Sequence, residues 1–461
     1  RLDGRFERVG IRVVLTEAAR IRQLAATNPM DNVALLRFLL AVLYWCKGVP
    51  PTPDERGRVL AGNGFPSEWL SKLEKHCDCF NLLGDGKRFY QNSAEKDRSP
   101  KHTTDYLIHE VPSGTNKWHF RHATDHEDGL CRACCAMGLV RLPVFATSGG
   151  AGKSPGINST PPLYVVPVGS TLASTLLYSW QTPRCQLGVP AWERPDSNLP
   201  HHGAVPLLTG LTWLPRSVWL ADPSETESIC ISCGRKERLI QRCVFAGKGS
   251  SKTGDRVWSD PHVVYETSET NKLFAIPTGN AMGSSSAAAD DWVRCLVAIL
   301  RDPRICGEVS LWIVGFSTDK DKYREATDWW LSPRGSVENL QELLANLDQW
   351  KKAGSKLADQ VRQSSTSRKR SAEIPPAVAA IRPDIEARVS RNVGELVSGD
   401  SAAWDRAAQE YAPLMKAIAT SLSPGFTTRA VERRERIARV LPNMKPAAKP
   451  KEPKGKKDGE P

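Results

Sequence analysis

The sequence predicts an α+β protein, with a mixed α/β N-terminal body followed by a C-terminal antiparallel helical bundle. Two regions of its 461 residues, which differ in composition and in hydrophobic periodicity, are the basis of this prediction. From Val111 to about Val257 the chain is rich in Pro, Gly and short β-branched runs, a pattern typical of short strands joined by long loops. Beyond about residue 288, amphipathic segments follow one another with short connections, which favours a bundle. We expect the body at 1–335, the bundle at 336–443 and a disordered Lys/Pro-rich tail at 444–461.

The body is expected to contain a buried helix near its start. Asp31–Tyr44 (DNVALLRFLLAVLY) is apolar on nearly all sides, which indicates burial, and Asn28 or Asp31 is the expected cap. Further pieces of helix and strand are expected in Leu60–Phe80 and Phe89–Ala94. The short β-type runs that follow are Leu163–Val168, Leu207–Leu214 and Ser217–Leu220.

The bundle prediction depends on helical periodicity. Leu340, Leu343, Leu344 and Leu347 form an apolar stripe at i, i+3, i+4 and i+7, as on the buried face of a helix. The expected helices of this region are Asp290–Leu300, Ser336–Gln363, Pro376–Val397, Ser401–Leu422 and Thr427–Val440.

Composition and charge favour a protein that binds a polyanion and argue against a membrane protein. Hydrophobic residues make up 40% of the chain and the formal net charge is +12, which points to a polyanionic partner such as nucleic acid. The tail Met444–Pro461 has six Lys against three acidic residues, which is +3, so +9 remains on the rest. We expect no membrane span and no signal peptide, because no apolar run reaches 18 residues. Twelve cysteines without a compact disulfide pattern indicate a reducing cytoplasm.

Two cysteine pairs predict a metal site. Cys131-Arg-Ala-Cys134 and Cys230-Ile-Ser-Cys233 each have C-x-x-C spacing, and two such pairs complete a tetrahedral thiolate shell for Zn²⁺. Gly234 follows the second pair, as in a zinc knuckle. About 95 residues separate the pairs, so the zinc is expected to join distant parts of the body as a structural metal. The alternatives are ordinary buried thiols, or a ligand set that includes the nearby Cys135 or Cys243.

A glycine-rich segment, Thr147–Gly156 (TSGGAGKSPG), follows the first cysteine pair. Glycines allow the backbone to approach a ligand closely, and Lys153 adds a positive charge. The segment is not a nucleotide-binding P-loop, because Thr147 stands where that motif requires its first Gly, and Pro155 disfavours the helix that follows it.

These motifs resemble the large subunit of the type I-E CRISPR surveillance complex, Cascade (the CasA family). The resemblance runs from about Arg1 to Trp330 and is strongest from Val111 to Gly156 (VPSGTNKWHF, then GLCRACCAMGLVRLPVFATSGGAGKSPGI). It implies a subunit that is not an enzyme. Such a subunit recognises the short motif beside the target (the PAM) on double-stranded DNA, helps to open the duplex and recruits a helicase–nuclease. The implied partners are the other Cascade subunits and the CRISPR guide RNA, which reads the remaining sequence.

The resemblance also implies DNA-binding residues. The family's glycine loop falls on Ser148–Gly156, and the loop that contacts the complex near the guide falls on Ser113–Phe120. The wedge inserted beneath the PAM falls in the turn Ser317–Lys322, and the family's minor-groove lysine lies upstream of Trp258-Ser-Asp-Pro-His262. Two lysines precede that pattern, and both stay candidates. The implied DNA-binding residues are Ser148, Gly149, Gly150, Gly152, Lys153, Asn116, Lys248, Lys252, Asp319 and Lys320.

Two other functions stay open from the residues alone. A stand-alone zinc-containing DNA-binding regulator agrees with the basic charge and the paired cysteines, although helix-turn-helix and finger spacings are not found. A metal-dependent nuclease is the other, since His119, His122 and His126 precede Cys131 at short spacing. No acidic partner motif accompanies these histidines, which favours a polar loop instead.

Overall fold

The computed structural model describes the greater part of the N-terminal body. The described ranges are 1–26, 28–108, 129–146, 153, 155–158, 164–183, 185–248, 256–263, 265–267, 273–275, 309–319 and 322–331. They belong to one compact unit, Arg1–Met282 with Asp302–Leu331. The expected bundle helices from Asp290 to Val440 and the tail lie outside the described residues, so both stay predictions.

The central element is the long helix α2 (Pro29–Lys47), which confirms and extends the helix expected at Asp31–Tyr44. Asn28 is the cap, since its side chain accepts a hydrogen bond from the amide of Met30 at 2.9 Å. Gly48 ends the helix with a φ of +86°, a conformation that favours glycine. By length and composition α2 is apolar enough to cross a membrane, but 78% of its apolar window is buried within the protein, as in a core helix.

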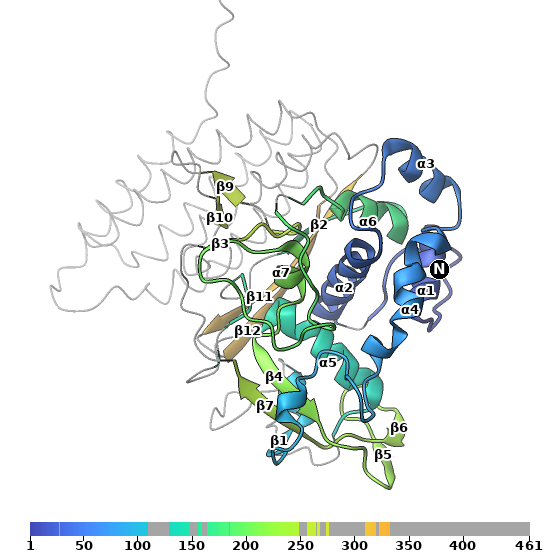
Figure 1. Cartoon of the computed structure of the whole chain (residues 1–461). Coiled ribbons are helices and arrows are strands. Elements are labelled where there is room, and N and C mark those ends of the chain that lie inside the picture. Colours follow the sequence, from blue (N-terminus) through green and yellow to red (C-terminus); the bar gives the residue numbers. More distant parts are fainter. Residues whose placement is uncertain are drawn as a thin grey trace, which may run out of the picture. The chain divides into compact units, whose positions relative to one another are not determined.

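Shorter helices surround α2 (Figure 1). Two expectations were wrong here: Leu207–Leu214 forms a helix over most of its length, and the part of Phe89–Ala94 that is regular is the start of a 3₁₀ turn. Short apolar runs of this kind fit strand and helix equally well. The helices and 3₁₀ turns are α1 (Ile11–Thr16), η1 (Ala18–Arg20), α3 (Pro53–Ala61), η2 (Ser67–Leu70), α4 (Ser71–Lys75), η3 (Cys77–Phe80), η4 (Ser93–Glu95), η5 (Thr104–Leu107), α5 (Arg132–Phe145), α6 (Leu172–Ser179) and α7 (Leu207–Thr212).

Two three-stranded antiparallel sheets complete the body. One has the order β2, β11, β12, and its first strand confirms the run expected at Leu163–Val168; the other has the order β1, β7, β4. The strands are β1 (His102–Thr103), β2 (Tyr164–Val168), β3 (Gly203–Ala204), β4 (Arg216–Leu220), β5 (Glu227–Ile229), β6 (Lys236–Arg238), β7 (Arg242–Gly247), β8 (Arg256–Val257), β9 (Tyr265–Thr267), β10 (Leu273–Ala275), β11 (Ser310–Asp319) and β12 (Lys322–Leu331).

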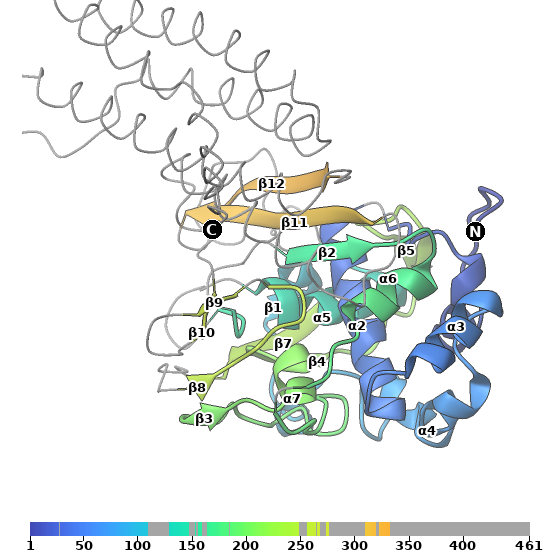
Figure 2. The same ribbon diagram turned by 90° about the horizontal axis from the view of Figure 1, so that it is seen from above.

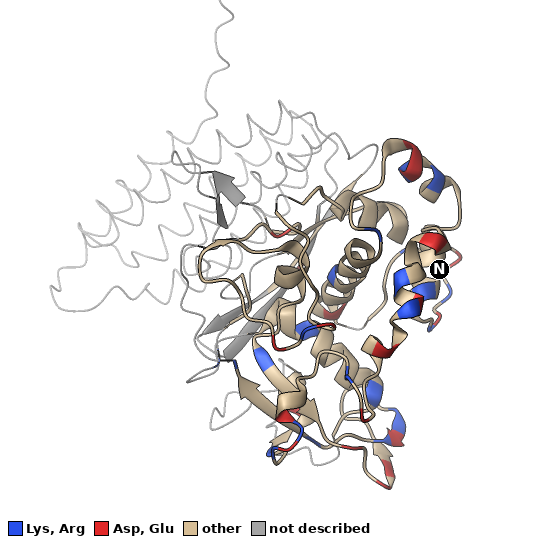
Figure 3. Ribbon diagram, viewed as in Figure 1, with Lys and Arg blue, Asp and Glu red and all other residues tan. Residues whose placement is uncertain are grey.

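These elements form layers around α2. Figure 2 shows the sheet of β2, β11 and β12 on one side of α2 and the helix α7 on the other. Charges of both signs are mixed on the outer helices α3 and α4 (Figure 3). Over these two helices the described surface therefore offers no basic patch.

Candidate metal centre and nucleic-acid interface

The four predicted cysteines meet at one point. Cys131 and Cys134 come from the start of α5, and Cys230 and Cys233 come from the loop between β5 and β6; their Sγ atoms all lie within 4.8 Å of one another. Four sulfurs at about 2.3 Å from a tetrahedral Zn²⁺ lie roughly 3.8 Å apart. The measured spread is compatible with such a shell, and the prediction that these two pairs come together is confirmed.

Backbone geometry brings the pairs together. The amide and carbonyl of Leu130 pair with those of Ile240 at 3.1 and 2.9 Å, which joins the start of α5 to the chain after β6. Gly129 has a φ of +81°, and a Cβ there would lie 2.4 Å from the carbonyl oxygen of Ile240. Gly234 closes the second turn, with a φ of +69° and its amide 2.9 Å from the carbonyl oxygen of Cys230. These two glycines are therefore required by the local backbone.

The sulfurs lie close to one another and to backbone amides. The amide of Cys131 donates to the sulfur of Cys230 at 3.3 Å, and the sulfurs of Cys131 and Cys233 lie 3.6 Å apart. Burial raises the pKa of Cys131 to about 11 and also raises the pKa of Cys134. Burial acts the same way on Cys230, but hydrogen bonds from neighbouring amides outweigh it and lower the pKa of that thiol. A bound divalent cation favours the thiolate form of all four.

Two nearby cysteines are excluded from this group by their geometry. The thiol of Cys135 faces the carbonyl of Leu130 at 3.8 Å, and that of Cys243 faces the carbonyl of Thr103 at 3.7 Å. Both are buried, and burial raises the pKa of Cys243 to about 12. They are packed as apolar thiols.

The ends of the glycine-rich segment are joined. The amide of Gly156 donates to the carbonyl of Ala146 at 3.0 Å, directly after the end of α5. Ser148, Gly149, Gly150 and Gly152 lie outside the described residues. The ammonium of Lys153 is 5.7 Å from the ring centres of both Tyr106 and Phe245, and burial followed by the charge of Arg216 lowers its pKa.

The other expected DNA-binding residues are only partly described. The ammonium of Lys248 donates to the carbonyls of Pro195 and Ser197, and burial lowers its pKa to about 8. Asn116, Lys252 and Lys320 lie outside the described residues, and Asp319 is described by its backbone alone.

The expected wedge is the end of a long hairpin, and its turn is shorter than predicted. Strand β11 continues to Asp319, which pairs with Lys322 at the start of β12, so Ser317 and Thr318 lie in a strand. A register shift between Ser317 and Thr318 lets the strands continue towards the turn.

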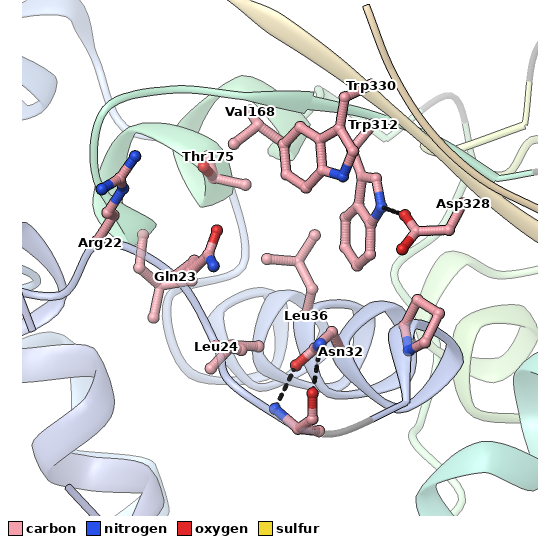
Figure 4. A pocket seen from close by; sticks show the side chains of 13 residues that line it. Arg22, Gln23, Leu24, Asn32, Leu36, Val168, Thr175, Trp312, Asp328 and Trp330 are labelled. Atoms are coloured by element: carbon pink, nitrogen blue, oxygen red, sulfur yellow. Dashed lines mark hydrogen bonds between the residues drawn. The ribbon is translucent and has the colours of Figure 1, made fainter. Parts of the chain in front are cut away.

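A small pocket lies at the root of this hairpin. The rings of Trp312 and Trp330 stack there with centres 5.4 Å apart, and the indole of Trp312 donates to Asp328 at 2.7 Å (Figure 4). The pocket has a volume of about 260 Å³ and is lined by both indoles, Arg22 and Gln23, among others.

Sequence reasoning missed a largely buried polar cluster formed by Arg37, Asn158, Asp260 and His262. The pattern Trp258-Ser-Asp-Pro-His262 was used only to locate the lysines upstream of it. A charged Arg inside the otherwise apolar helix Asp31–Tyr44 was the signal that a buried acidic partner exists.

The fold and the cysteine cluster define a mixed α/β protein with four cysteines gathered at the start of α5, the helix that ends one residue before Ala146. Residues 1–444 match the family described as CRISPR-associated protein Cse1. The chain belongs to this CRISPR-associated Cse1 family, and the resemblance inferred from the sequence is confirmed.

Individual proteins with similar sequences or structures carry the same family name. A CRISPR-associated protein CasA/Cse1 of Thermus thermophilus is 29% identical over 205 residues, 42% of this chain and 40% of that protein. A solved structure of Thermus thermophilus CasA (Cse1) has a TM-score of 0.62 at 17% identity and covers 95% of both chains. A chain from a structure titled "CRISPR RNA-guided surveillance complex, pre-nicking" has a TM-score of 0.59 at 16% identity, with 94% of both chains covered.

Proposed function

We propose that this chain is the non-catalytic large subunit of a type I-E Cascade complex. Its role is to recognise the PAM on double-stranded DNA, to start strand separation and to recruit a helicase–nuclease. Family membership and the likeness to a chain from an RNA-guided surveillance complex support this role. Its partners are then the other Cascade subunits, the guide RNA and the target duplex, and the complex acts in the cytoplasm.

One observation supports the DNA-reading role most strongly. Helix α5 begins at the cysteine cluster and ends at Phe145, one residue before Ala146, whose carbonyl closes the base of the glycine-rich segment. A metal at the cluster therefore fixes the helix that presents the segment. Rigid support on both sides is what a loop needs if its backbone is to read the edge of a DNA groove.

We assign Zn²⁺ to the cluster and give it a structural role. Four cysteine ligands leave no open position for a substrate or water, which excludes a catalytic metal of the usual kind at this point. The amide of Cys131, which contacts the sulfur of Cys230, stabilises the thiolates around the ion.

The lysines then divide into two roles. Because the ammonium of Lys248 already donates to two carbonyl oxygens, we assign the minor-groove contact to Lys252 and a structural role to Lys248. Lys153, next to the glycines, is assigned to phosphate, Asp319 and Lys320 to the wedge, and Asn116 to the loop near the guide.

The test compares duplex and single-stranded targets. In the assembled complex, replacing Gly150 by Trp blocks approach of the segment to a duplex and weakens duplex binding. Binding of a single-stranded target is retained, because no PAM is read there. Gly86→Trp is the matched control, since Gly86 is exposed with no atom within 4 Å of an added Cβ. Equal losses on both targets would refute the assignment.

A further inference from the structure

A buried ion pair forms the centre of the polar cluster. Both guanidinium NH groups of Arg37 reach Asp260, at 2.6 Å each, and the two side chains are 1% and 0% exposed. Burial raises the pKa of Asp260, but the charge and hydrogen bonds of Arg37 outweigh it and lower that pKa. Asp260 is therefore a carboxylate with fixed acceptors, which orients the groups that donate to it.

Asn158 is the group that connects this carboxylate to a second segment. Its Nδ2 donates to Asp260 at 2.8 Å and to the hydroxyl of Tyr164 at 3.3 Å, while its Oδ1 accepts from the indole of Trp258 at 2.8 Å. An indole only donates and a carboxylate only accepts. The amide of Asn158 has therefore one orientation that satisfies both neighbours.

The residues of the cluster lie close in sequence to the glycine-rich segment and to the candidate lysines. Asn158 lies two residues after Gly156, where the glycine-rich segment ends, and Trp258 lies six residues after Lys252. The hydroxyl of Tyr164 also donates to the carbonyl of Val144, just before the segment begins. Residues 248–252, which carry both candidate lysines, are called the lysine segment. Asn158 thus joins the residues that flank both ends of the glycine-rich segment, directly or through Tyr164, to Trp258, which follows the lysine segment.

Trp258 and His262 are themselves held in place. A Cβ added to Gly210 of α7 would lie 2.2 Å from the Trp258 ring, so the indole packs directly on the helix backbone. The amide of Val165 in β2 donates to the carbonyl of His262 at 2.8 Å, and β2 pairs with β11 of the wedge hairpin. The same cluster therefore contacts the residues that flank the glycine-rich segment and, through β2, lies one strand away from β11, which leads to the wedge turn.

We infer that Asn158 is a positioning residue that sets the glycine-rich and lysine segments relative to each other, so that both meet one duplex. The inference rests on the proposed function. Its energetic basis is preorganisation: segments held in their bound arrangement lose less entropy on binding than segments that order separately. Asn158 contacts no DNA in this account.

The test uses the assembled, guide-loaded complex with two variants, one that removes all side-chain hydrogen bonds of Asn158 and one that removes the bond from Trp258. Asn158→Leu is nearly isosteric, and Trp258→Phe removes the indole donor together with part of the six-membered ring that packs on Gly210. The matched control is Trp45→Phe, because the indole of Trp45 donates to Glu193 at 2.6 Å in another part of the body. Dissociation constants are measured for a PAM-bearing duplex and for the single-stranded target, with melting temperatures of each variant.

We expect Asn158→Leu and Trp258→Phe to weaken duplex binding by about tenfold or more, with single-strand binding within about twofold of the parent. Trp45→Phe should lower the melting temperature to a similar degree without changing either constant. Unchanged duplex binding by Asn158→Leu, or equal losses on both targets, would overturn the inference. If the parent complex itself binds duplexes equally with and without a PAM, the proposed function fails instead, which distinguishes the two failures.

Discussion

Arg37 of α2 and Asp260 form a two-point ion pair across 223 positions of sequence, with both side chains closed off from solvent. Arg37 also lies over the ring of Tyr164, 4.5 Å from its centre. The pair therefore joins the central helix to the segment after the candidate lysine loop and to the sheet that carries the wedge hairpin.

Removing one member of this pair should be strongly destabilising. Arg37→Met leaves a buried carboxylate without its cation, and we expect a loss of about 3–5 kcal/mol in the free energy of unfolding. Adding Asp260→Asn removes the unpaired charge and should recover part of the loss. Urea denaturation of the isolated chain measures both. A loss below about 1 kcal/mol in the single variant would mean that the pair is not buried in solution.

His262 should make stability fall as the pH falls. Burial, followed by the charge of Arg37, lowers its pKa to about 3, from an ordinary value of 6.5. Between these values the unfolded chain binds a proton at His262 that the folded chain does not, so stability is full above about pH 6.5 and decreases below it, by up to about 1.4 kcal/mol per pH unit.

The measurement for this prediction is the free energy of unfolding as a function of pH, in the parent and in His262→Asn. The amide oxygen of Asn replaces the ring Nδ1 that faces Arg37 at 3.2 Å, without a titrating group. We expect a shallower pH dependence in the variant. Thiol titration at the metal centre is common to both proteins and cancels in the difference, so parallel curves would rule out His262 as the source.

The cluster of four cysteines predicts one Zn²⁺ per chain. Cys131→Ser should lose the metal and lower stability by at least about 2 kcal/mol, because the thiolate shell joins α5 to the β5–β6 loop. Cys135→Ser is the control, since its thiol is buried next to the site but points to the carbonyl of Leu130. The measurements are the zinc content by elemental analysis and the thermal unfolding of the parent and of both variants. Purified parent protein without zinc, or zinc loss in Cys135→Ser alone, contradicts the ligand assignment.

The two candidate lysines should separate into a structural and a DNA-binding residue. Lys252→Met should weaken binding of the complex to duplex DNA and reduce the slope of log K against log salt by about one. Lys248→Met should leave that slope unchanged and lower the melting temperature, because its ammonium is bound to the carbonyls of Pro195 and Ser197. The reverse pattern would return the minor-groove role to Lys248.

The sequence predicted correctly those features that depend on residues close together in the chain. The spacing of Cys131 and Cys134 points two sulfurs to one place whatever the rest of the fold does, and the alternation-free run at Tyr164–Val168 is a buried strand. The apolar run at Leu207–Thr212 had no periodicity to separate helix from strand, and tertiary packing decided for a helix.

The polar cluster was beyond sequence reasoning for a different reason. The partners Arg37, Asn158 and Asp260 are distant in the chain, and nothing in their immediate neighbours specifies which carboxylate meets which guanidinium. Such pairings are set by the arrangement of α2 against the segments that pack on it. Only the anomaly of a charged residue within an apolar helix was visible beforehand.

The most direct test of the central claim is a binding screen of the guide-loaded complex against duplexes that share one target and differ in the flanking triplet. Arg is absent from Ala146 to Leu163, so in the proposed function a glycine-rich backbone with one lysine reads the groove with few bidentate side chains. We predict that several related triplets are accepted, with about 1–3 kcal/mol lost per unfavourable pair. Equal affinity for every flanking triplet would contradict PAM recognition by this subunit.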